Sequence, residues 1–117
     1  MRKSLTKAEI LRRGPEISRV FGGKAVYRTE GLHLRIVGND LEWSRVLFAA
    51  PRTFRGAVAR NRARRYLREA YRLIKHRIRG SYDLAFILYP GDYGFADRFR
   101  QVETLLYRAG AIPRAKE

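Results

Sequence analysis

The sequence contains no cysteine, which excludes disulfide bonds, thiolate zinc sites and cysteine nucleophiles together. Acidic residues are also scarce: 11 Asp and Glu stand against 26 Lys and Arg, and the formal net charge is +15. So large a positive charge repels itself and is typical of proteins that bind a polyanion. The composition therefore favours a nucleic acid as the partner, with an anionic membrane surface as the second alternative.

Long hydrophobic runs are absent too. The longest stretch of apolar or aromatic side chains, "LAFILY", is far too short to span a bilayer, and the N-terminal "MRKSLTKAEI" lacks the apolar stretch of a secretory signal. We therefore expect a cytoplasmic protein with no membrane partner. The length of 117 residues, 45% of them hydrophobic and 32% charged, predicts one globular domain over 1–117, with an N-terminal extension over 1–15 and a tail over 111–117.

The N-terminal half is expected to contain two short helices followed by strands. Thr6 stands three residues before Glu9, a capping box that opens a short helix over 6–13. Gly14 and Pro15 interrupt this helix, and "PEISRVF" starts the next one. "KAVYRT", "GLHLRIVG" and "SRVLFAAP" are typical of three successive strands, the second with clear alternation of apolar and polar residues. Three strands in sequence predict an antiparallel meander.

The C-terminal half alternates between helix and strand. Residues 57–79 carry an apolar stripe at helical spacing, which predicts the longest helix of the chain; the stripe consists of Ala63, Leu67, Ala70, Ile74 and Ile78, flanked by Tyr71. "YDLAFILY" is a continuous apolar run, as in a strand covered on both faces. "FADRFRQVETLLYRAG" predicts a closing helix. The expected fold is an α+β domain in the order α-β-β-β-α-β-α.

Positive charge is concentrated around the long helix. Residues 52–79 hold eleven Lys or Arg and a single acid, Glu69, so this segment carries +10 of the net +15. A helical projection places one basic stripe opposite the apolar one, made of Arg64, Arg68, Arg72, Lys75 and Arg79, with Arg62 and Arg65 beside it. Like charges four residues apart destabilise a helix by a few tenths of a kcal/mol per pair, so a bound polyanion is the expected compensation.

Arginine dominates lysine on this face, which favours forked hydrogen bonds to phosphates and stacking on bases. That preference indicates structured RNA more than a membrane, and only Tyr66 and Leu73 could supply apolar contact at the edge of the face. A merely solvated face is the alternative, although such faces usually interleave Glu with Lys. The residues thus predict an RNA-binding module.

An autonomous enzyme has no support in the sequence. His33 and His76 do not stand at metal-ligand spacing from an acid, and we assign no metal ligands. Asp92 and Asp97 fall in segments where Asp caps turns and helices, which disfavours a magnesium set with Asp83. No nucleophile motif or phosphate-binding glycine loop is present.

The segment "AVARNRARRYLREAYR" resembles the signature of the bacterial ribonuclease P protein subunit, in which R-N-R is followed by x-[KR]-R-x-[LI]-R-[EQ]-[AF]. The resemblance extends to "EISRVFGGK", to "SYDLAFILYPG" and to "LLYRAG", so it covers most of the chain from about residue 16 to 110. It implies a single two-layer domain with a mixed four-stranded sheet. It also implies a left-handed crossover, whereas general frequencies favour a right-handed one.

The resemblance implies that the protein is a non-catalytic subunit. In the family a large RNA, with magnesium ions held mainly by that RNA, hydrolyses the bond that joins the 5′ leader to precursor tRNA. The expected partners are therefore ribonuclease P RNA and precursor tRNA, the free protein is expected to be a monomer, and no organic cofactor is implied. The alternative is a ribosomal-type RNA-binding protein with no role in cleavage.

The resemblance also implies two sets of binding residues. Contact with the catalytic RNA falls on Arg52, Arg60, Asn61, Arg62, Arg64, Arg65, Arg68 and Arg72. A leader-binding cleft falls on Ile17, Phe21, His33 and Arg35, with Ile17 in place of the family's first aromatic residue. "PRTFRGAV" also departs from the usual S-K-K-x-G-x-A, although it keeps Arg52.

Overall fold

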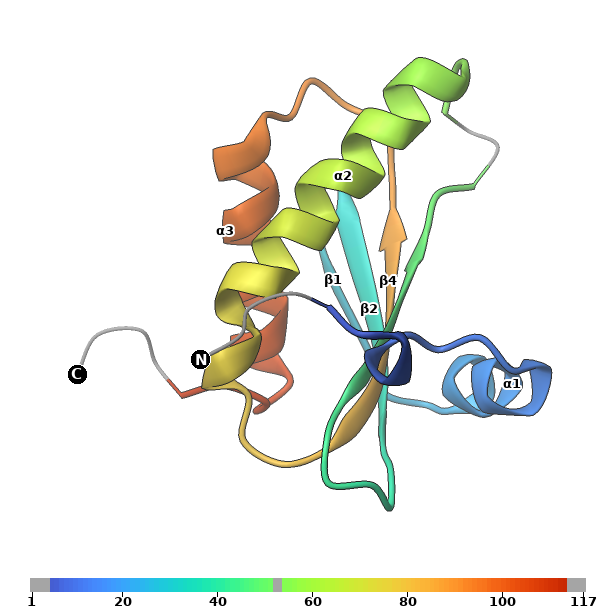
Figure 1. The fold of residues 1–117 in the computed structure, drawn as a ribbon. Coiled ribbons are helices and arrows are strands. Elements are labelled where there is room, and N and C mark those ends of the chain that lie inside the picture. Colours follow the sequence, from blue (N-terminus) through green and yellow to red (C-terminus); the bar gives the residue numbers. More distant parts are fainter. Residues whose placement is uncertain (1–4, 52–53, 114–117) are drawn as a thin grey trace.

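The computed structural model describes residues 5–51 and 54–113 (Figure 1). The described residues form the predicted series of helices and strands, which are α1 (Gly14–Gly22), β1 (Val26–Thr29), β2 (Leu32–Gly38), β3 (Arg45–Ala49), α2 (Ala57–Ile74), β4 (Tyr82–Leu88) and α3 (Phe95–Arg108). Two single turns of 3-10 helix accompany them, η1 (Lys7–Glu9) and η2 (Lys75–Arg77). The α+β element order is therefore confirmed.

The four strands form one mixed sheet in the order β1-β2-β4-β3. β1 pairs with β2 and β2 with β4 in antiparallel fashion, while β3 runs parallel to β4 at the other edge. The predicted antiparallel meander is wrong, because β4 inserts between β2 and β3. Since β4 has an apolar side chain at nearly every position, it is best accommodated where both its faces are covered, and β3 takes the edge.

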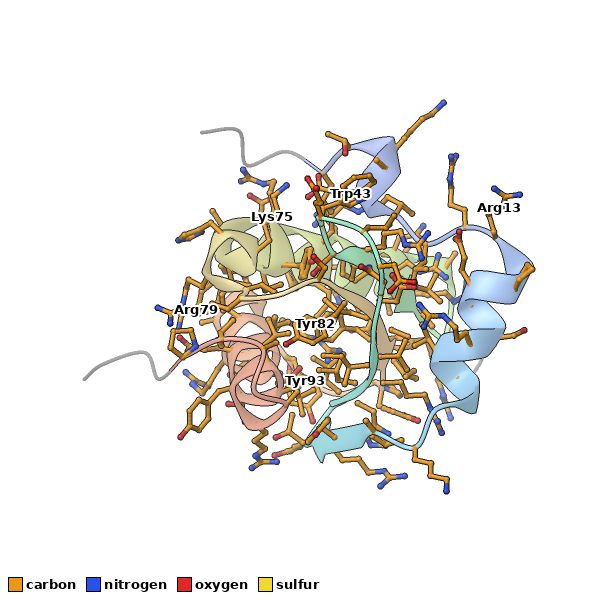
Figure 2. All side chains as sticks on the ribbon, turned by 90° about the horizontal axis from the view of Figure 1, so that it is seen from below. Arg13, Trp43, Lys75, Arg79, Tyr82 and Tyr93 are labelled. Atoms are coloured by element: carbon orange, nitrogen blue, oxygen red, sulfur yellow. The ribbon has the colours of Figure 1, made fainter. Side chains whose placement is uncertain are left out.

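A crossover through α2 connects the parallel strands β3 and β4. Viewed from the side that α2 covers, with both strands pointing up, β4 lies to the left of β3 (Figures 1 and 2). The crossover is therefore left-handed, as the resemblance implies and against the general preference. It places the first turn of α2 at the end of the sheet where β3 and β4 end (Figure 1).

Helices lie on both faces of the sheet. α2 and α3 cover one face, and the main core between these two layers includes the apolar stripe predicted for α2. Leu32, Leu34 and Ile36 of β2 point into this core, as their alternation predicts. Figure 2, seen from below, shows α1 on the opposite side of the sheet. There α1 adds a partial third layer over a smaller cluster centred on Leu11, Val20 and Ala85.

Two predicted helix boundaries change. The long helix ends at Ile74 rather than at 79, because the chain tightens into η2 and Ile78 already has extended backbone (φ −70°, ψ 129°). The helix predicted over 6–13 reduces to η1. Its capping box is present: the Thr6 amide donates to Glu9 Oε1 at 2.9 Å. Glu9 also accepts from Lys75 Nζ at 2.9 Å, which fixes the N-terminal segment against the end of α2.

A buried charge network attaches α1 to the sheet. Asp83 of β4 has no exposed surface and accepts hydrogen bonds from Arg45 at 2.7 and 2.9 Å, from Asn39 at 2.9 Å and from Arg19 of α1 at 3.0 Å. Arg45 reaches Glu16 of α1 as well, at 2.7 Å. Burial alone would raise the pKa of Asp83, but the hydrogen bonds from Arg45, Asn39 and Arg19 outweigh it and lower that pKa. Asp83 thus has a structural role, since it joins α1 to the sheet.

Candidate RNA-binding surface

The part of α2 between residues 60 and 68 presents a cluster of arginine side chains without acidic partners among the described residues. We call it the arginine face; it consists of Arg60, Asn61, Arg62, Arg64, Arg65 and Arg68. Arg60 is half-buried and the other five are exposed. Within the described residues, these side chains form no hydrogen bond or ion pair; Arg65 and Arg68 only lie over the rings of Tyr66 and Phe48, at 5.8 and 6.0 Å. The guanidinium groups are therefore available to a ligand.

The second half of α2 is different, because acids neutralise it. Arg72 is half-buried and forms an ion pair with Glu69, and Lys75 binds Glu9 of the N-terminal segment. The basic stripe expected from the sequence is thus interrupted at Arg72 and Lys75, while its members near the start of the helix and Arg79 are exposed. Cations at a helix N-terminus oppose the helix dipole, so the positive charge at the start of α2 does not stabilise the helix. It is placed where it can attract an anionic ligand. Arg52 lies outside the described residues.

A second candidate surface lies on the sheet face beside α1. Phe21, at the end of α1, has 37% of its surface exposed. The Arg35 guanidinium of β2 donates to the Phe21 carbonyl at 3.0 Å and lies 5.7 Å from the centre of the Phe21 ring. Here the cation is at the C-terminal end of a helix, where it is favourable. The contact holds an aromatic ring and a positive charge together on an open surface.

His33 extends this surface along β2. Its ring lies 4.5 Å from that of Tyr89, and Arg28 is its partner across the β1–β2 pair. Ile17 is placed differently: it is half-buried against the cluster of Leu11, Val20 and Ala85 beneath α1. The structure therefore brings Phe21, His33 and Arg35 to one face of the sheet and uses Ile17 mainly for packing.

His33 is expected to titrate below the ordinary histidine range. Burial lowers its pKa, and the positive charges of Arg28 and Arg35 lower it further. We predict that the pKa of His33, measured by NMR titration of the imidazole carbon-bound protons, lies below about 6.5. It should rise in an Arg28→Gln variant. An unchanged or raised pKa would contradict the close approach of the two arginines.

A sequence model of the Ribonuclease P family matches residues 5–110. The chain belongs to this family. Among curated relatives, the ribonuclease P protein component of Dehalococcoides mccartyi is 35% identical over 109 residues, covering 92% of this chain and 89% of the relative. That of Borrelia hermsii is 37% identical over 93 residues, covering 78% and 79%.

Solved structures of family members have the same fold. A mutant RNase P protein from Staphylococcus aureus superposes with a TM-score of 0.83 at 18% identity, over 91% of this chain and 92% of that one. The RNase P protein from Thermotoga maritima gives 0.76 at 24% identity, over 84% and 97%. In the chain described here, the R-N-R signature, Arg60 to Arg62, lies near the start of α2.

Within the described residues, no three His, Asp or Glu side chains gather as metal ligands, and no helix is long and apolar enough to cross a membrane.

Sequence reasoning missed Arg98, which has only 2% of its surface exposed. A signal existed, since Arg98 precedes Val102 and Leu105 by four and seven residues and so shares their buried helix face.

Proposed function

We propose that this chain is the RNA-binding, non-catalytic protein subunit of ribonuclease P and promotes 5′ maturation of precursor tRNA. One observation carries the proposal: the arginine face, which includes the R-N-R signature, is largely exposed and has no ionic partner among the described residues. Guanidinium groups make forked hydrogen bonds to phosphates, and several on adjacent helical turns can follow one RNA backbone. The catalytic RNA is the partner that we assign to this surface.

The open face made by Phe21, His33 and Arg35 is proposed to hold the 5′ leader. An exposed aromatic ring can stack on a base, while Arg35 supplies positive charge for the phosphates. We further propose that the RNA holds the magnesium ions that supply the hydrolytic chemistry. The role of the protein is to neutralise phosphates and orient the leader, as a monomer when free, in the bacterial cytoplasm.

The proposal is tested by cleavage of a precursor tRNA by a bacterial ribonuclease P RNA at low magnesium, with and without this protein. We expect stoichiometric protein to restore cleavage, because it neutralises phosphate charge that magnesium otherwise screens. RNA binding without restored cleavage would favour the ribosomal-type alternative. As a control, affinity for the RNA should fall steeply as salt rises, and a flat response would contradict phosphate neutralisation.

A further inference from the structure

A pocket of about 330 Å³ lies between α2, the loop after β4 and the start of α3. Its lining comes from segments far apart in the sequence, including Arg55, Arg62, Tyr66, Tyr93 and Arg98. The volume is within the range of pockets that hold small organic ligands. Arg62 belongs to the arginine face, so the pocket opens beside the surface proposed to bind RNA.

Arg98 is the unusual member of this lining. Its guanidinium donates to the Gly31 carbonyl at 2.8 Å, to the Tyr89 carbonyl at 3.0 Å and to Gln101 Oε1 at 3.0 Å. All three acceptors are neutral, and Arg98 forms no ion pair with any described residue. Its Nε is buried and finds no acceptor there. Burial lowers the pKa of Arg98, and the electrostatic effect of Tyr93 and Asp97 offsets this only in part, so the buried charge is incompletely compensated among the described residues.

The charged side chains that line the pocket are all positive, while Glu30 contacts Tyr93 and Asp97 acts on Arg98 from outside the lining. Three arginines line it, and none of the described lining residues is acidic. A second pocket of about 360 Å³ lies at the other end of α2, and its lining contains both signs of charge, Glu9 and Glu42 as well as Arg72 and Lys75. The lining of the pocket at Arg98 therefore favours an anion, whereas the lining of the second pocket has no such preference.

The lining also supplies aromatic surface. Tyr66 of α2 and Tyr93 of the loop are both half-buried, and the Arg98 guanidinium lies 4.6 Å from the centre of the Tyr93 ring. Aromatic rings stack on nucleobases, and arginines bind the attached phosphate. We infer that this pocket binds one unpaired nucleotide of an RNA strand, with its phosphate beside Arg55, Arg62 and Arg98 and its base against the tyrosines.

The inference rests on the proposed function, because it takes the nucleotide from an RNA that already contacts the arginine face. The strand could be the catalytic RNA or the leader of precursor tRNA, and both present the same chemistry to the pocket. A nucleotide held here would fix the register of that strand relative to α2, which a row of phosphate contacts alone does not do.

The first experiment is an NMR titration of the isotopically labelled protein with adenosine 5′-monophosphate, adenosine and inorganic phosphate, at constant ionic strength. We expect saturable shifts of the Tyr66, Gly91 and Tyr93 amides with the monophosphate, with an affinity at least about tenfold above that of adenosine or phosphate alone. Equal responses to the monophosphate and to phosphate would overturn the nucleotide site and leave only general anion binding.

Variants locate the site. Arg98→Gln should weaken binding of the monophosphate about tenfold. Because Arg98 is buried, its replacement can unfold the domain, so Arg55→Gln is the second variant. Arg55 is exposed and makes no hydrogen bond to a described residue, and its replacement should weaken binding several-fold.

Arg79→Gln is the matched control. Arg79 is exposed beyond the other end of α2 (Figure 2), and its replacement removes the same charge but should change the affinity less than about twofold. Equal effects of all three would contradict a defined site.

A competition experiment identifies which RNA strand supplies the nucleotide. Displacement of the bound monophosphate by ribonuclease P RNA, or by a leader oligonucleotide, would assign the nucleotide to that strand. If neither displaces it, the inference of an RNA nucleotide is wrong even though the pocket binds. The cleavage assay is independent of this readout, so restored cleavage without monophosphate binding would refute the pocket alone, and binding without restored cleavage would refute the proposed function alone.

Discussion

Replacing Arg60 and Arg62 together by alanine is expected to weaken binding of ribonuclease P RNA about a hundredfold, with little change in stability. Hydrogen bonds to charged groups contribute about 1.5 to 3 kcal/mol each, and loss of about 3 kcal/mol from the pair corresponds to this factor. Neither side chain has a hydrogen-bonding or ionic partner among the described residues, so the fold does not depend on them. Filter binding at fixed salt and thermal unfolding measure the two quantities.

A matched control separates contact from general charge. Arg12 and Arg79 are also exposed, and replacing both by alanine makes the same change in net charge away from the start of α2. This double variant should lose less than about tenfold in affinity, since exposed charges beyond a Debye length of about 8 Å are largely screened. Equal losses would show that the arginine face has no special role. A loss of stability matching the loss of affinity would make Arg60 and Arg62 structural.

The largest effect on stability is expected at Asp83. Asp83→Ala leaves Arg45 and Arg19 without their buried acceptor and removes the ion pair between Arg19 of α1 and the sheet. Removing one partner of a buried ion pair costs about 3 to 5 kcal/mol, a large part of the 5 to 15 kcal/mol that stabilises a typical domain. Chemical denaturation at pH 7 measures the loss. Asp92→Ala, an exposed loop position, is the control and should stay within about 0.5 kcal/mol of the parent.

The stability contributed by Asp83 should also depend on pH. The pKa of Asp83 is lower in the folded chain than in the unfolded one. Its contribution to the free energy of unfolding is therefore fully present above the unfolded pKa of about 3.9, and it is lost as the pH falls through the folded pKa. The stability difference between the parent and Asp83→Ala should therefore narrow below about pH 4. A difference that stays constant down to pH 2 would contradict the lowered pKa.

The RNA-binding prediction shows where sequence reasoning stops. The R-N-R block and the apolar stripe are readable because a helix repeats its faces at a fixed spacing. The sequence also suggested a basic stripe extending to residue 79, whereas Arg72 and Lys75 are engaged by Glu69 and Glu9. The contact between Lys75 and Glu9 joins residues 66 positions apart, which no local pattern can indicate.

The sequence by itself determined the α+β element order, the core face of each helix, the concentration of charge on α2 and the family, because all of these follow from local spacing and residue type. Only the tertiary structure decided the strand order, the face shared by Phe21 and Arg35, and the pocket at Arg98. These features depend on which distant segments pack together and exclude water. The free energy of that packing is determined by the whole chain, so no single segment predicts it.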